Sequence, residues 1–135
     1  MSHPNDVLVR RWFEEVWNQR RLASIDELAD PDCVGHSENG RLEGIDAWRA
    51  MFDAFIAAMP DLRATVEDVL VDGDRVSVRW SFTGTHTAAL QDIPPTNRAI
   101  HARGTTWFRV ADGRLVEAWD TWNQGALLAS LARRA

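Results

Sequence analysis

The spacing of apolar residues changes near the middle of the chain, from a helical period to strict alternation. In the first half, apolar residues recur every three or four positions, which predicts helices over residues 4–19, 24–28 and 44–59. Pro60 ends the longest of these helices, because a proline does not continue a helix. The first half of the chain is therefore expected to be mainly helical.

Shorter elements are predicted between these helices from local capping and turn residues. Ser24 and Glu27 have the spacing of a capping box, so the short helix is expected to begin at Ser24. Asp30-Pro31-Asp32 ends it, because the residue before a proline avoids the α region. Residues 33–37 then suggest a short strand, and Asn39-Gly40 a turn.

The second half of the chain alternates apolar and polar residues, which is the period of half-buried strands. Tight turns are expected at residues 72–74 and 112–113, so that the strands form two hairpins. Residues 87–98, which contain two consecutive prolines, are expected to be a loop. The predicted strands are residues 62–71, 75–86, 99–110 and 115–122, and a short helix follows from Gly125.

Helices followed by a run of long antiparallel strands indicate an α+β domain with its helices on one face of the sheet. A length of 135 residues suits one domain over residues 1–135. Long twisted strands tend to curl, and a curled sheet closed by helices encloses a space for a ligand. The expected fold is a cone-shaped curved antiparallel sheet wrapped around the N-terminal helices, with a pocket inside.

Charge and composition narrow the classes of partner and chemistry. The net charge of −5 argues against nucleic acid as the main partner. All 15 basic residues are Arg, so Schiff-base chemistry through a Lys is excluded. Cys33 is the single cysteine, which excludes an internal disulfide. Residues 1–11 lack the apolar run of a signal peptide and no stretch is apolar enough to span a bilayer, so we expect a cytoplasmic protein without a membrane partner.

Asp120 is the strongest candidate for a catalytic group. Alternation puts it on one strand face with Val116, Ala118 and Trp122, three apolar residues, so this face is expected to point inward. Burial among apolar groups raises the pKa of a carboxyl and makes it a suitable general base beside a carbonyl. The alternative is a structural Asp that hydrogen-bonds an Arg or a backbone N–H.

Histidines supply further candidates for the site. Alternation places His86 on the face of Trp80 and Phe82, where it would contact a substrate carbonyl or instead tie down the loop that follows it. His36 is expected to face the same cavity, in a functional or a structural role, whereas His101 is expected to be exposed. No metal-binding spacing is present, so no metal is expected, although His36, His86 and Asp120 together are a conceivable set of ligands.

Aromatic residues are the expected wall of the pocket. Seven Trp in 135 residues is a high number, and Trp supplies large flat apolar area to a ligand pocket or to a core. The candidate ligand-binding residues are Trp12, Trp17, Phe52, Phe55, Trp80, Phe82, Thr106 and Trp122. Trp107 falls on the opposite face of its strand from Thr106, and an exposed aromatic group there would favour a partner chain.

With these residues identified, nearly the whole sequence resembles a SnoaL-like polyketide cyclase, within the superfamily of nuclear transport factor 2-type folds. The resemblance rests on the order and spacing of short motifs. They are Ala29-Asp-Pro-Asp32, Gly44, Met59-Pro-Asp61, Gly73-Asp74, Gly84-Thr-His86, Ile93-Pro-Pro-Thr96, Phe108-Arg109, Asp112-Gly113 and Glu117-Ala-Trp-Asp120.

This resemblance implies a cone-shaped α+β barrel that needs no cofactor and forms a homodimer or a larger homo-oligomer. Cyclases of the family close a polyketide ring by an intramolecular aldol reaction, with a pocket Asp as acid and base. Asp120 matches that Asp, and His86 matches a family position. The family's other polar pocket positions, an Asn and a His, fall near Gly35 and His36 and at Thr106.

Three hypotheses for function remain open from the sequence. The first is a cofactor-free cyclase, isomerase or lyase acting on a small apolar carbonyl compound, with Asp120 as base and His36 or His86 at the enolate oxygen. The second is epoxide hydrolysis, which requires an inward-pointing Arg; Arg79, Arg103 and Arg109 are the candidates. The third is a ligand-binding or dimerisation module without catalysis.

Overall fold

One curved sheet of six strands, in the order β2-β1-β6-β5-β4-β3, forms the framework of the molecule. The computed structural model describes residues 2–133. The sheet is antiparallel except where β1 runs parallel to β6. The elements are α1 (Pro4–Arg11), a π-helical segment η1 (Trp12–Asn18), α2 (Leu22–Leu28), β1 (Ala29–Ser37), β2 (Gly40–Glu43), α3 (Ile45–Ala58), β3 (Arg63–Asp72), β4 (Arg75–Thr85), β5 (Ala99–Ala111), β6 (Arg114–Trp122) and α4 (Gln124–Ala132).

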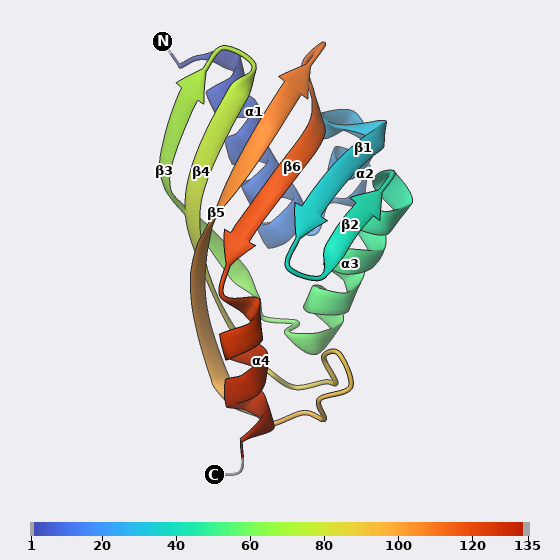
Figure 1. Cartoon of the computed structure of the whole chain (residues 1–135), viewed down its shortest axis with the longest axis vertical. Coiled ribbons are helices and arrows are strands. Elements are labelled where there is room, and N and C mark those ends of the chain that lie inside the picture. Colours follow the sequence, from blue (N-terminus) through green and yellow to red (C-terminus); the bar gives the residue numbers. More distant parts are fainter. Residues whose placement is uncertain (1, 134–135) are drawn as a thin grey trace.

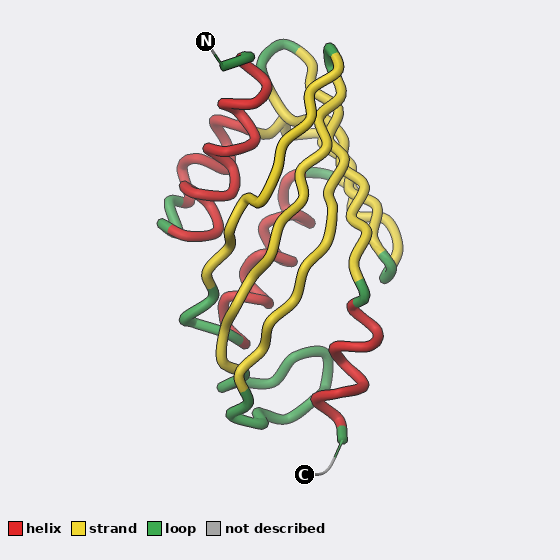
Figure 2. The backbone as a smooth tube through the Cα atoms, turned by 90° about the vertical axis from the view of Figure 1, so that its left-hand side faces the viewer, coloured by secondary structure: helices red, strands yellow, loops and turns green. Residues whose placement is uncertain are grey.

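The helices α1, α2 and α3 lie on one face of the sheet, and the strands curve around them (Figures 1 and 2). Alternate residues of β4, from Val76 to Phe82, are buried against these helices, as the alternation predicts. This inner face carries the core, while none of the helices in residues 2–133 covers the outer face. The expected α+β cone is confirmed. Among residues 2–133, no helix is long and apolar enough to cross a membrane.

The boundaries of β1 and β2 differ from the expectation. β1 begins at Ala29 rather than at Cys33 and so includes Pro31. Pro31 lies in an irregular stretch between Ala29 and Val34, where the register with β6 shifts. Such a stretch tolerates a proline, which has no N–H to donate to a neighbouring strand. β2 is a short polar edge strand that the pattern of apolar residues does not indicate.

Residues 12–18 form a π-helix rather than a continuation of α1. The backbone N–H of Gln19 donates to the carbonyl of Glu14, five residues earlier, at 2.8 Å. In this geometry residues five apart, such as Trp12 and Trp17, fall on the same side of the helix, which an α-helix would not allow. The π-helix therefore brings both Trp side chains to the interior of the cone.

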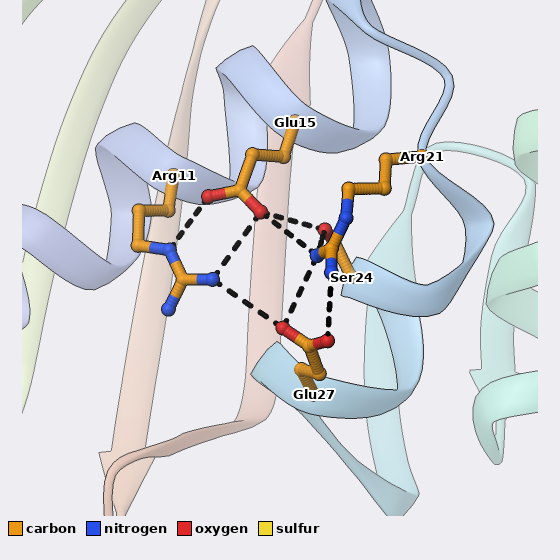
Figure 3. A network of polar contacts seen from close by, with 5 residues as sticks. All are labelled: Arg11, Glu15, Arg21, Ser24 and Glu27. Carbon is orange, nitrogen blue, oxygen red and sulfur yellow. Dashed lines mark hydrogen bonds and ion pairs between the residues drawn. The ribbon is translucent and has the colours of Figure 1, made fainter.

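A polar cluster holds this π-helix against α2, and it replaces the predicted capping box (Figure 3). α2 begins at Leu22, so Ser24 lies inside the helix, where its hydroxyl donates to Glu15 at 2.7 Å. Arg11 and Arg21 bridge Glu15 and Glu27. Hydrogen bonds from Arg11 and Ser24 lower the pKa of Glu15 to about 2, so this carboxylate stays ionised and holds the two helices together.

β6 contains a β-bulge, and because of it the prediction that Val116 faces inward is wrong. Val110 pairs with Leu115 and Arg109 pairs with Glu117, which leaves Val116 as the extra residue. Leu115, not Val116, is therefore fully buried in the core. Beyond the bulge the alternation holds, and Asp120 lines the interior of the cone.

Candidate active site

The cone encloses a cavity of about 100 Å³ between the sheet, η1 and α3. Most of the residues around it are aromatic or aliphatic, and partly exposed residues of β1, β2 and α3, among them Ser37, Leu42 and Met51, mark its mouth. The nineteen lining residues are Trp12, Phe13, Trp17, Gly35, His36, Ser37, Leu42, Trp48, Met51, Phe55, Leu62, Ala64, Trp80, Phe82, Thr106, Phe108, Ala118, Asp120 and Trp122.

Asp120 is the one carboxylic acid among these lining residues. Burial among apolar groups raises the pKa of its carboxyl, and a hydrogen bond from Thr106 opposes part of that rise. Within residues 2–133, Asp120 forms no ion pair, and its Oδ2 atom has no hydrogen-bond partner. The alternative of a structural Asp held by an Arg therefore does not fit, and one carboxylate oxygen remains available to a ligand.

A short chain of hydrogen bonds orients this carboxyl. The indole N–H of Trp80 donates to Thr106 Oγ1 at 2.8 Å, and the Thr106 hydroxyl donates to Asp120 Oδ1 at 2.6 Å. Because the Thr106 oxygen accepts from Trp80, its single proton is directed to Asp120. The three residues come from three neighbouring strands. Thr106 on β5 pairs with Asp120 on β6, and on its other side it pairs with Val78 on β4, two residues before Trp80.

Gly104 makes room for the aromatic residues beside this chain. A Cβ atom at this position would lie 2.5 Å from the Trp122 Cβ and 2.9 Å from the Trp80 ring. The Trp80 and Trp122 rings meet edge to face, with centroids 5.9 Å apart. The absence of a side chain at Gly104 thus permits the packing that holds the Trp80 N–H over Thr106.

Seven of the eight predicted ligand-binding residues line the cavity, and Phe52 does not. Phe52 is buried behind the wall, where its ring packs edge to face on Trp17 at 5.1 Å. Helical spacing identifies the inward side of α3 but does not distinguish the residues at the cavity from those behind it. Trp48, on the same stripe of α3, does line the cavity and was not singled out as a candidate.

His86 does not line the cavity, in contrast to the expectation. Its ring is fully buried, and its Nδ1 lies 2.9 Å from Thr96 Oγ1 and accepts from the Thr96 backbone N–H. Its backbone N–H and carbonyl bond Arg98 and Asn97. His86 therefore ties down the loop of residues 87–98, which is the structural alternative considered for it.

His36 belongs to the cavity lining, but its ring is directed away from Asp120. The imidazole stacks on Trp119, and its Nε2 lies 2.7 Å from Glu117 Oε2. Trp119 and Glu117 alternate with Asp120 along β6, so they lie on the outer face of the sheet. Gly35 is the residue of β1 that faces inward here, and the predicted role of the His36 side chain at an enolate oxygen is not supported.

The arginines proposed for epoxide hydrolysis also lie outside the cavity. Arg79 and Arg103 are exposed, and Arg109 bonds Glu117 on the outer face. Epoxide hydrolysis would require a water held between carboxylates and an Arg, but the cavity lining contains no Arg and only one carboxylate. In the described part of the chain, no group of three or more His, Cys, Asp or Glu has the geometry to hold a metal ion.

Comparisons with known proteins agree with this architecture. A model of the family described as SnoaL-like polyketide cyclase matches residues 7–131. The chain belongs to this family. A proposed SnoaL-like polyketide cyclase from Jannaschia sp. CCS1 is 26% identical, with a TM-score of 0.89 over 98% of this chain and 94% of that one. No match was found among the curated proteins.

Two further solved structures have similar folds but are named for different reactions. IdmH from Streptomyces antibioticus, a proposed polyketide cyclase, is 29% identical, with a TM-score of 0.81 over 98% of this chain and 100% of that one. AclR from Streptomyces galilaeus, a proposed hydroxylase, is 27% identical, with a TM-score of 0.83 over 96% of both chains. The fold is thus shared by proteins named for different reactions, so the reaction must be argued from the site.

Proposed function

We propose that this SnoaL-like protein is a cofactor-free cyclase, isomerase or lyase in which Asp120 is the general acid and base for a small apolar carbonyl compound. The observation that carries the proposal is the position of Asp120, a carboxyl with a raised pKa and a free Oδ2 in an aromatic cavity. A raised pKa suits a group that must both take and return a proton near neutral pH.

The proposed reaction starts with proton transfer from the carbon beside a substrate carbonyl to Oδ2 of Asp120. The electron pair of the broken C–H bond forms an enolate, and Asp120 becomes neutral. In a cyclisation, the enolate carbon attacks a second carbonyl of the same molecule, and the new alkoxide takes the proton back from Asp120. In an isomerisation, the proton returns to another carbon. Both routes regenerate the carboxylate without a cofactor.

The cavity volume limits what the site holds without rearrangement. An apolar cavity of about 150 Å³ is known to bind benzene, and this one is smaller, at about 100 Å³. One end of a substrate therefore fits beside Asp120, and the rest extends through the mouth or displaces partly exposed residues such as Leu42 and Met51. We infer a substrate with a compact apolar reactive end.

Hydrogen–deuterium exchange at carbon tests the proposal. The purified protein is incubated with 2-indanone in D2O, and loss of the α-proton signal is followed by NMR. We expect exchange above the buffer background and a loss of about 10²–10⁴-fold in the Asp120→Asn variant, the usual contribution of a positioned base. Glu117→Gln is the matched control on the outer face. Equal exchange by the wild type and the Asp120→Asn variant would contradict the proposal.

A ligand-binding module without catalysis is the second candidate. One observation favours it: the two histidine side chains considered for the enolate oxygen are engaged elsewhere, by Thr96 and by Glu117. This candidate predicts that 2-indanone binds without accelerated exchange and that Asp120→Asn leaves its affinity unchanged. The same exchange and binding measurements therefore distinguish the two.

We also propose that a second copy of the chain covers the outer face of the sheet. Trp107 is 47% exposed there and borders a shallow depression with Ser77, Thr105, Trp119 and Thr121. An exposed aromatic group on an uncovered sheet face favours association. Light scattering after size-exclusion chromatography is expected to show a dimer for the wild type and more monomer for Trp107→Arg. A monomeric wild type at micromolar concentration would argue against this.

A further inference from the structure

The indole nitrogen of Trp48 is a buried donor without a partner. Trp48 is 5% exposed and lines the same cavity as Asp120. Among the side chains of residues 2–133, only Trp48 Nε1 and His86 Nε2 are fully enclosed without a hydrogen bond, and of these two only Trp48 belongs to the cavity. A buried Trp N–H usually finds a partner, and leaving one unpaired is unfavourable. The unpaired N–H of Trp48 is therefore a candidate hydrogen-bond donor to a ligand in the cavity.

Gly35 lies directly beside this nitrogen. A Cβ atom on Gly35 would lie 3.2 Å from Trp48 Nε1 and 3.6 Å from the Leu42 Cβ. Glycine at this position of β1 therefore lets the indole approach the strand closely, and a side chain here would press on the N–H. Leu42, on the edge strand β2, is partly exposed and packs beside Gly35 on the side of the mouth.

The register of the strands places Gly35 near Asp120. Gly35 pairs with Ala118 in the parallel ladder of β1 and β6, and Asp120 is two residues further along the same inner face. Two residues of a strand span roughly 7 Å. Trp48 and Asp120 therefore line the same part of the cavity wall.

The other polar groups of the inner wall are already engaged. The Trp80 N–H donates to Thr106, the Thr106 proton goes to Asp120, and the His36 ring contacts Glu117. The Trp48 ring is held in place by an edge-to-face contact with Trp12, with centroids 5.6 Å apart. A rigid donor opposite a base is the arrangement that stabilises an enolate oxygen.

We infer that Trp48 Nε1–H donates a hydrogen bond to the carbonyl oxygen of the ligand whose α-carbon faces Asp120. The inference deepens the proposed function, on which it rests for the presence of a carbonyl in the ligand. Trp48 is then the residue that selects ketones over hydrocarbons of the same shape, and Leu42 moves aside as the ketone enters. The hydrogen bond strengthens as charge develops on the oxygen during proton removal.

Paired probes with and without the oxygen test this inference. The affinities of 2-indanone and of indane, the same ring system without the carbonyl, are measured by titration calorimetry. The wild type is expected to bind 2-indanone about 3- to 10-fold more tightly than indane, the range for one hydrogen bond to a neutral acceptor. Trp48→Phe is expected to remove this preference while changing the affinity for indane less than about threefold.

Gly35→Ala is the second variant, and it keeps the indole. Its methyl group presses on Nε1 at 3.2 Å and displaces the indole, so the variant is expected to remove the same preference for the ketone. Trp107→Phe, on the outer face, is the control for replacing a Trp in this fold, and its preference is expected to match the wild type.

The outcomes separate this inference from the proposed function. Asp120→Asn is expected to keep the preference for 2-indanone while losing α-proton exchange. An unchanged preference in Trp48→Phe or in Gly35→Ala would overturn the inference, whether or not exchange depends on Asp120. Loss of the preference in both variants, with exchange independent of Asp120, would support the inference and contradict the proposed function. No binding of either probe to the wild type at millimolar concentration would overturn both.

Discussion

Glu117 and Asp120 are two carboxylates on one strand, three residues apart, and the sheet gives them opposite environments. Glu117 lies on the outer face, where hydrogen bonds from His36 and Arg109 lower the pKa of its carboxyl. Asp120 lies on the inner face, where burial raises the pKa of its carboxyl and Thr106 alone donates to it within residues 2–133. The difference shows that burial on one face and polar partners on the other, and not the residue type, set the direction of each pKa shift.

The inner face is expected to tolerate added volume far less than the outer face does. Gly104→Ala forces a Cβ atom against Trp122 and Trp80, so we expect it to lower the free energy of unfolding by about 1–3 kcal/mol. Urea denaturation measures the change. Thr105→Ala, the neighbouring position on the outer side, is the control and is expected to change stability by less than about 1 kcal/mol. Equal effects of the two changes would contradict the comparison.

The two carboxylates are expected to affect stability with opposite dependence on pH. The raised pKa of Asp120 means that the folded protein loses stability as pH rises from about 4, the ordinary value for Asp, through the folded value. Asp120→Asn is therefore expected to gain stability over the wild type as pH rises from 3 to 7, by about 1.4 kcal/mol for each unit of pKa shift.

Glu117→Gln should behave in the opposite way. The lowered pKa of Glu117 adds stability above about pH 4, and this stability is lost as pH falls through the folded value. The variant is thus expected to be less stable than the wild type at pH 7 and equal to it near pH 2. Urea titrations of both variants at several pH values check this pair, and curves of the same sign would refute it.

Thr106→Val is expected to change the pH dependence of catalysis. It removes the hydrogen bond that opposes the rise in the pKa of Asp120, so the midpoint of the rate profile for α-proton exchange should move to higher pH. We expect a further loss of about 3- to 10-fold in the rate at high pH, because the carboxyl is less well oriented. Thr105→Ala again serves as the control, and an unshifted midpoint would show that Thr106 does not set the pKa.

The smallest effect is expected at Arg109. Its side chain is partly exposed and pairs with Glu117 at 3.2 Å, and exposed ion pairs contribute less than about 1 kcal/mol. Arg109→Met is expected to change the free energy of unfolding by less than that amount and to leave the exchange rate within about twofold. A larger loss of exchange would mean that the outer face communicates with Asp120.

Most of the fold could be predicted from the sequence because the helical spacing and the strand alternation of apolar residues each extend over long segments. The four long strands and α3 follow the expected bounds within a few residues. Asp120 was found in the same way, since alternation along a strand identifies a polar residue among inward apolar ones. The prediction was least accurate where one residue changes the register, as at Val116 and between Ala29 and Val34.

The partners of Asp120 were harder to predict because they depend on contacts between distant segments. A strand pattern places His36 near the cavity, but a shift of one residue decides whether the ring or Gly35 faces inward. The bond between His86 and Thr96 belongs to a loop without periodicity. Neither the pairing of Thr106 with Trp80 nor the unpaired N–H of Trp48 has a signal in the local sequence, since both result from packing across the cone.

The π-helical segment determines how the cavity wall responds to a change in chain length. Trp12 and Trp17 reach the cavity together because one extra residue is accommodated in the turn between them. Deleting one residue from Glu14–Val16 would place the two Trp residues four apart, and in a regular α-helix residues four apart again lie on the same side. The π-helical turn therefore absorbs one residue of chain length while both Trp side chains keep facing the cavity.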